Sequence, residues 1–142
     1  MKKLKIDKKI IFERMKIIEI HVGRLEEIRE LSKAKFAFPD NFAIAAYNLR
    51  SALEATFDIC AHILSRIPGA QIDEYKKMAL EMGRQKVIPN DFAEENLYEM
   101  AGYRNRLTHF YFEVSAKEMH KIIQNNLDDF RVFLKHIKKF VE

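Results

Sequence analysis

The sequence predicts an all-α protein, an antiparallel up-and-down bundle of four to five helices. Only four glycines and three prolines occur in 142 residues, whereas an all-β chain needs turn residues every eight to twelve positions. Apolar residues recur at steps of three and four, which is the spacing of one helix face. The hydrophobic content of 48% supports one core, so we expect a single helical domain over residues 1–142.

The N-terminal half predicts two long helices. The first is expected to begin after Asp7, a suitable N-cap, and to run to about Ser32. Its apolar stripe is Ile11, Met15, Ile18, Val22 and Leu25. A connector that holds Phe36, Phe38 and Pro39 leads to the second helix, which Pro68-Gly69 should end. The second helix is the most apolar segment, so we expect it at the centre of the bundle.

The C-terminal half predicts three further helices. A shorter one should run from Asp73 to near Gly83, and a fourth should open at Pro89-Asn90-Asp91. The fourth carries the stripe Ala93, Leu97, Met100 and Leu107. After an aromatic and β-branched break at 110–114, the box Ser115-Ala116-Lys117-Glu118 should cap one last helix. Its stripe is Ile123, Leu127, Phe130, Leu134, Ile137 and Val141.

Composition limits the classes of function. Charged residues make up 32% and interrupt every apolar run, so we expect no membrane span and no secretion signal. The net charge of +4 permits an anionic partner such as RNA without indicating one. Cys60 stands alone in an apolar helical pattern, which favours a core residue over a nucleophile and a reducing, cytoplasmic location.

Metal and cofactor sites are not indicated. The chain has no glycine-rich phosphate loop and no cysteine or histidine pairs at zinc-binding spacing, so we expect neither a metal nor a cofactor. Four histidines lie far apart and are interpreted as surface or packed residues. They are His21, His62, His120 and His136.

An arginine interrupts the stripe of the fourth predicted helix. Steps of four and three from Met100 reach Arg104, then Leu107, then Tyr111. A guanidinium is costly to bury, so Arg104 should either extend to water, the commoner outcome, or meet an anion. His109 follows five residues later and falls on another face of a straight helix. The two side chains converge only if the helix ends near Thr108 or if a second copy of the chain completes the site.

This segment carries a family motif. The run from Arg104 to Tyr111 reads R-x4-H-x-Y, with a polar residue directly after the arginine. Flanking segments also match, namely 100–103, 126–130, Leu49-Arg50 and 61–63. Over roughly residues 10 to 137, the sequence resembles the HepT-like toxin family of the HEPN superfamily.

The resemblance implies a helical homodimer in which two copies of the motif face each other in a cleft and cleave RNA without a metal. Arg104 and His109 are the implied catalytic residues: a histidine transfers protons near neutral pH, and a guanidinium holds phosphate oxygens. HepT-like toxins are encoded beside a minimal nucleotidyltransferase antitoxin resembling MntA. That partner is understood to transfer AMP onto the motif tyrosine, here Tyr111.

The remaining motif residues have open alternatives. Asn105 either orients the phosphate or a histidine, or makes a local helix hydrogen bond. Arg106 is either a surface charge or an RNA contact, and Thr108 is expected to help end the helix. Tyr111 is a core aromatic, a hydrogen-bonding group in the cleft or the AMP acceptor, and the family motif favours the acceptor.

Two other functions compete with the nuclease. The first is a non-catalytic helical module that binds a nucleotide or substrate for a separate minimal nucleotidyltransferase. It would use the same basic cleft, with Arg104 gripping phosphate and His109 in a structural role. The second is a plain oligomerisation scaffold.

Overall fold

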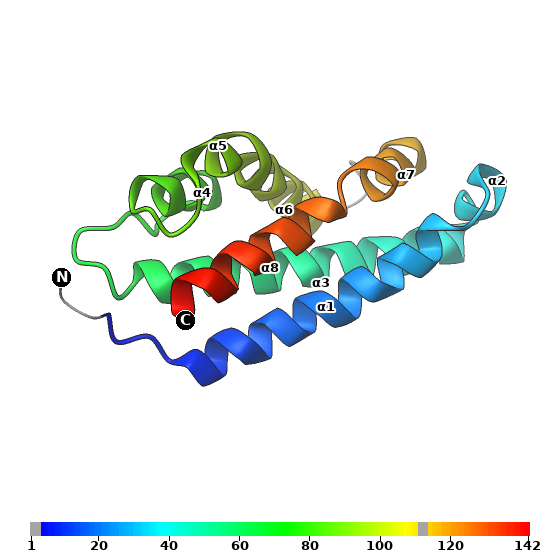
Figure 1. The fold of residues 1–142 in the computed structure, drawn as a ribbon. Helices are drawn as coiled ribbons and strands as arrows, with labels where there is room; N and C mark the ends of the chain where they lie inside the picture. Colours follow the sequence, from blue (N-terminus) through cyan, green and yellow to red (C-terminus); the bar gives the residue numbers. More distant parts are fainter. Residues whose placement is uncertain (1–3, 111–113) are drawn as a thin grey trace.

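The protein is a helical bundle (Figure 1). The structure, a computed structural model, describes residues 4–110 and 114–142, and for 108–110 it describes the backbone alone. Helices α1 (Lys8–Arg29) and α3 (Pro39–Leu64) lie side by side along the molecule and run in opposite directions. The described residues contain no strand. These features confirm the predicted all-α antiparallel bundle.

Helix α1 forms as its sequence predicts at the start and ends earlier than expected. The Asp7 side chain caps it by accepting hydrogen bonds from the backbone N–H groups of Lys9 and Ile10. All five residues of the predicted stripe are buried. The helix ends at Arg29 because Ser32 caps a separate short helix, α2 (Lys33–Phe36), where it accepts a hydrogen bond from Lys35 N.

Helix α3 is the central element, with 26 residues. Pro39 occupies its first turn, where no N–H is needed. The helix ends at Leu64, and Gly69 then turns the chain with a φ of +79°. Cys60 is fully buried in α3, and burial raises the pKa of its thiol, which confirms the interpretation as a core residue.

Gly83 has a packing role that the sequence pattern did not predict. Helix α4 (Tyr75–Arg84) ends one residue after Gly83, close to the predicted end. A Cβ atom at Gly83 would lie 2.6 Å from Asn90 Oδ1 and 2.7 Å from the Cβ atom of Ala93. The missing side chain therefore lets the start of the next helical segment press against α4.

The predicted fourth helix is interrupted. It comprises α5 (Asn90–Phe92), a π-helical turn η1 (Ala93–Leu97) and α6 (Tyr98–Phe110). The expected stripe residues Ala93, Leu97, Met100 and Leu107 are nevertheless all buried. A π-helical turn holds an extra residue per turn, so it changes the register between α5 and α6 without ending the helix.

The single last helix predicted from the sequence is wrong. Ser115 caps α7 (Ala116–Asn125) through a hydrogen bond from Glu118 N, as the box predicts. The chain then bends at Asn126, which leaves the helical region and donates a side-chain hydrogen bond to Glu99 on α6. A separate helix, α8 (Asp128–Val141), follows and packs on α1. Every residue of the predicted stripe remains buried, because the bend keeps both halves facing the core.

None of the helices in the described segments is long and apolar enough to cross a membrane.

Replacing Gly83 by Ala should destabilise the protein by about 1–3 kcal/mol, because the new methyl group overpacks the contact with Asn90 and Ala93. Gly23→Ala is the matched control: it also lies within a helix, but its Cβ atom would meet nothing within 4 Å. The control should be neutral or stabilising by up to about 1 kcal/mol through helix propensity. Urea unfolding measures both variants, and equal stability of the two would contradict the close-approach role.

Candidate functional site

The candidate site lies on α6, which packs against both α3 and α4. Of the motif residues, Arg104, Asn105 and Arg106 are all partly buried on this helix. The backbone at His109 belongs to α6, and its side chain lies outside the described part of the structure. Tyr111 lies outside the described residues. The structure therefore defines the arginine end of the motif.

Arg104 stacks on an aromatic ring. Its guanidinium carbon lies 3.9 Å from the centroid of the Tyr75 ring on α4, which is a close cation–π contact. The Nε atom of Arg104 is buried and makes no hydrogen bond. The sequence predicted either exit to water or an anion as partner, and a ring from another helix was not among those alternatives. The stack fixes the guanidinium and leaves hydrogen-bonding capacity unused.

The ring under Arg104 is itself held in place. Tyr75 packs edge-on against Phe57 of α3, with ring centroids 5.6 Å apart and an interplanar angle of 74°. Tyr75 is the first residue of α4, so its position depends on the loop that precedes it. Neither Tyr75 nor its role could be found from motif spacing, because the contact joins two separate helices.

A buried carboxylate anchors that loop. Glu81 is 3% exposed and accepts hydrogen bonds from Arg84 Nε at 2.6 Å and from Gln85 Nε2 at 2.9 Å. It also accepts one from the backbone N–H of Gln71 at 3.2 Å, inside the loop before α4. The hydrogen bonds from Arg84 above all lower the pKa of Glu81 to about 2. The carboxylate is therefore ionised near neutral pH and ties the loop to α4.

Asp58 adds a negative charge near Arg104. It lies on α3 and forms an ion pair with Arg14 of α1 at 3.3 Å. Partial burial raises the pKa of Asp58, while the positive charges of Arg14 and Arg104 act in the opposite direction. Among the described residues, no carboxylate comes within ion-pair distance of Arg104 itself.

Arg106 has a carboxylate partner. Its Nη1 and Nη2 atoms each donate a hydrogen bond of 2.7 Å to Glu118, so the fork bridges α6 and α7. The same pair lowers the pKa of Glu118. The side chain of Asn105 makes no hydrogen bond to another described residue. RNA contact by Arg106 and the role of Asn105 stay predictions.

The four isolated histidines are packed or surface residues, as predicted. His21 Nδ1 lies 2.8 Å from Asn48 Oδ1, and His62 Nε2 accepts a hydrogen bond from Asp7 N. His120 and His136 pack edge-on against phenylalanine rings. In the segments that the structure describes, no group of histidine, cysteine and acidic side chains is arranged to hold a metal ion.

Comparison with known proteins supports the family resemblance. The family model described as "Ribonuclease HepT-like" matches residues 18–137. A tRNA nuclease HepT from Aphanizomenon flos-aquae is 21% identical over 96% of this chain and 92% of its own length. An mRNA nuclease HepT from Shewanella oneidensis is 26% identical over 91% of this chain and 96% of its own length. These matches confirm the resemblance read from the sequence.

A solved structure supports the fold. The tri-AMPylated Shewanella oneidensis HEPN toxin, in complex with MNT antitoxin, superimposes with a TM-score of 0.79 at 24% identity. The match covers 92% of this chain and 97% of that chain. The HEPN-like form of the predicted bundle is therefore confirmed.

The stack of Arg104 on Tyr75 should appear as a coupling free energy. In a double-mutant cycle of Tyr75→Leu and Arg104→Met, measured by urea unfolding, we expect a coupling of about 0.5–2 kcal/mol. Tyr75→Phe keeps the ring face and should retain most of the coupling. Additive effects of the Leu and Met substitutions would show that the contact contributes nothing.

Proposed function

The chain belongs to the HepT-like ribonuclease family, and on that premise we propose that it is a metal-independent endoribonuclease toxin controlled by a nucleotidyltransferase antitoxin. The observation that carries the proposal is the family match over 18–137, which includes the whole R-x4-H-x-Y run on and beyond α6. As a ribonuclease, the protein would act on cytoplasmic RNA.

The chemical step needs a base, an acid and a cation. The ribose 2′-hydroxyl loses its proton and attacks the adjacent phosphorus, so a 2′-O–P bond forms. The 5′-O–P bond then breaks, and the leaving 5′-oxygen takes up a proton. The products are a 2′,3′-cyclic phosphate and a 5′-hydroxyl end. An imidazole can accept or donate a proton near neutral pH, and a guanidinium offsets the charge that builds on the phosphate oxygens.

Arg104 fits the role of the cation. The ring of Tyr75 supports one face of its guanidinium, and the Nε atom stays without a hydrogen bond. A donor that is already fixed loses less conformational freedom when it binds phosphate. Because no described carboxylate pairs with it, phosphate need not displace an internal partner.

The continuity of α6 favours a site shared by two chains. Helix α6 extends to Phe110, so the backbones of Arg104 and His109 lie on one continuous helix. Five residues along a continuous helix place two side chains roughly 140° apart around the axis. Convergence through a second copy remains, and a two-fold axis would also supply two histidines, one for each proton transfer. We therefore propose a homodimer with Arg104 and His109 in the cleft between the chains, with Asn105 assisting there.

The purified protein should cleave RNA in the presence of EDTA, because the proposed mechanism needs no metal. His109→Ala should abolish cleavage by removing the proton-transfer group. Arg104→Ala should lower it by about a hundredfold or more, because it removes the cation from the phosphate. Gel analysis of labelled RNA and end-group analysis for the 2′,3′-cyclic phosphate measure both effects.

Arg131→Ala, which alters an arginine on α8 paired with Glu26, is the control and should cleave normally. Wild-type activity in both motif variants would contradict the site. If the wild type and the control do not cleave RNA, and the wild type nevertheless binds a nucleotide, the non-catalytic binding module would be favoured. Light scattering should show a dimer at micromolar concentration.

The antitoxin is proposed to act on Tyr111. The matched Shewanella toxin is AMPylated and bound to its MNT antitoxin, and the motif tyrosine of this chain is Tyr111. In the proposed transfer, the phenol oxygen attacks the α-phosphate of ATP, its proton is lost and diphosphate leaves. The added adenylate would bring a negative charge to the motif that also carries Arg104, where it would compete with RNA phosphate.

Incubation with a cognate MntA-like nucleotidyltransferase, ATP and magnesium should add AMP to the wild-type protein and block cleavage. Tyr111→Phe keeps the ring but lacks the acceptor hydroxyl, so it should gain no AMP and stay active. Intact mass spectrometry measures the modification. Equal labelling of both proteins would rule out Tyr111 as the acceptor, and inhibition without labelling would point to control by binding alone.

A further inference from the structure

A second arginine shares the unusual state of Arg104. In the described part of the chain, two side-chain polar atoms are buried without a hydrogen-bond partner, and both are arginine Nε atoms. One belongs to Arg104 on α6 and the other to Arg50 on α3, the helix against which α6 packs. A buried donor without a partner in the protein is costly, so ordered water or a ligand is expected to satisfy it.

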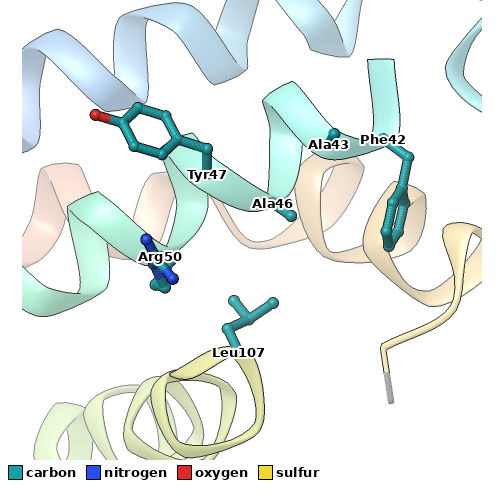
Figure 2. A pocket seen from close by; sticks show the side chains of 6 residues that line it. All are labelled: Phe42, Ala43, Ala46, Tyr47, Arg50 and Leu107. Atoms are coloured by element: carbon teal, nitrogen blue, oxygen red, sulfur yellow. The ribbon is translucent and has the colours of Figure 1, made fainter. Parts of the chain in front are cut away.

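Arg50 stands at a pocket between these two helices. Figure 2 shows Arg50 on α3 and Leu107 on α6 on either side of an open space, with Tyr47 at its edge and the Tyr47 ring directed away from Leu107. The volume of this pocket is about 250 Å³. Phe42, Ala43 and Ala46 complete the lining. The floor is apolar, since Leu107 is fully buried and Ala46 is 8% exposed. Leu107 is also one turn from Arg104 on the same helix, so the pocket adjoins the proposed catalytic arginine.

The guanidinium of Arg50 has a distant acidic partner within the protein. Glu54 approaches its Nε atom to 3.8 Å, a distance at which an ion pair exists but no hydrogen bond forms. The side chain of Arg50 is 40% exposed, so the guanidinium can be reached from solvent although its Nε atom is buried. An anion entering the pocket would find an unused Nε donor beside an apolar wall.

The pocket rim carries an exposed aromatic ring. Tyr47 is 57% exposed and packs on one side against His21, in an edge arrangement with ring centroids 5.7 Å apart. An aromatic ring that is open to solvent and held from one side is a good platform for a nucleobase. A cation, an apolar floor and an aromatic platform together match the phosphate, sugar and base of one nucleotide.

We propose that this pocket is a substrate subsite that binds the RNA nucleotide next to the scissile phosphate, with its phosphate on Arg50 and its base on Tyr47. The inference rests on the proposed function, because the location beside Arg104 is what selects RNA over other anions. Arg50 is a binding residue in this scheme: it holds a neighbouring phosphate and takes no part in proton transfer. The subsite extends the substrate path from α6 onto α3.

Binding to an uncleavable RNA tests the subsite separately from catalysis. The probe is a short single-stranded 2′-O-methyl RNA of mixed sequence, whose blocked 2′-oxygens cannot attack phosphorus. In the His109→Ala protein, Arg50→Ala should raise the Kd of this probe about tenfold or more, as expected for loss of a charge-assisted hydrogen bond. It should also reduce the slope of log Kd against log salt concentration by about 0.7, the value for one phosphate contact.

Two further variants separate the chemical roles. Arg50→Lys keeps the charge but loses the planar fork, so its Kd should lie between those of the parent and Arg50→Ala. Tyr47→Ala should raise the Kd roughly fivefold or more, while Tyr47→Phe should bind as the parent does, since stacking needs only the ring. The matched control is Arg131→Ala, whose side chain is 44% exposed and also has an acidic partner. It should leave the Kd unchanged.

In the cleaving protein, Arg50→Ala should raise KM and leave kcat within a few-fold of the wild type. Unchanged probe binding by both Arg50→Ala and Tyr47→Ala would overturn the subsite, and so would dissociation of the dimer by Arg50→Ala, which would make Arg50 an interface residue. If the wild type fails to cleave RNA while binding still depends on Arg50, the proposed nuclease fails and the nucleotide subsite stands. If the wild type cleaves RNA normally but probe binding does not depend on Arg50, the proposed nuclease stands and the subsite fails.

Discussion

Arg104 places a permanently charged guanidinium at a seam position of α6, where the helix packs against its neighbours. The neighbouring helices must accommodate this charge. An apolar side chain at Arg104 would have completed the stripe between Met100 and Leu107, whereas a charge there must be compensated. Compensation comes from the face of Tyr75, and Tyr75 is placed by Phe57 on α3. Residues of three helices, α6, α4 and α3, therefore share in compensating the desolvation of the Arg104 guanidinium. The same contacts fix the direction in which the guanidinium points.

Much of the fold could be predicted because local sequence determines it. The α1 stripe and the caps at Asp7 and Ser115 depend on residues within a few positions of one another. The features that were predicted wrongly depend on competition between two possible helix caps or on contacts between residues far apart in the sequence. Ser32 starts a new helix instead of lying in the first one, and the bend at Asn126 is stabilised by Glu99 on another helix. A stripe predicts which residues are buried and does not report a bend that keeps them buried.

In the candidate site, too, the features that come from local sequence could be predicted and the contacts between helices could not. The motif residues were found from one stretch of sequence, and the helical backbone confirms that Arg104 lies on the seam of α6. Its support by Tyr75 could not be predicted, since a cation–π contact between helices leaves no spacing signal. The anchoring of the loop by Glu81 left a weak signal in Arg84 and Gln85, three and four residues later. Arg50 lay in a segment that resembled the family, and only the pocket gives it a role.

Four arginines of this chain differ in whether a carboxylate of the protein accepts hydrogen bonds from them. Arg84 and Arg106 each grip a carboxylate with two hydrogen bonds, so binding an anion there would break a good ion pair and leave a carboxylate uncompensated. Arg104 and Arg50 instead keep a buried Nε without a partner. A phosphate chain that crosses from α6 to α3 would gain hydrogen bonds at both positions without displacing a hydrogen-bonded acid. Two unused donors on neighbouring helices thus favour a polyanionic substrate over a single anion, because one chain of linked phosphates can contact both arginines without the entropy cost of binding two separate anions.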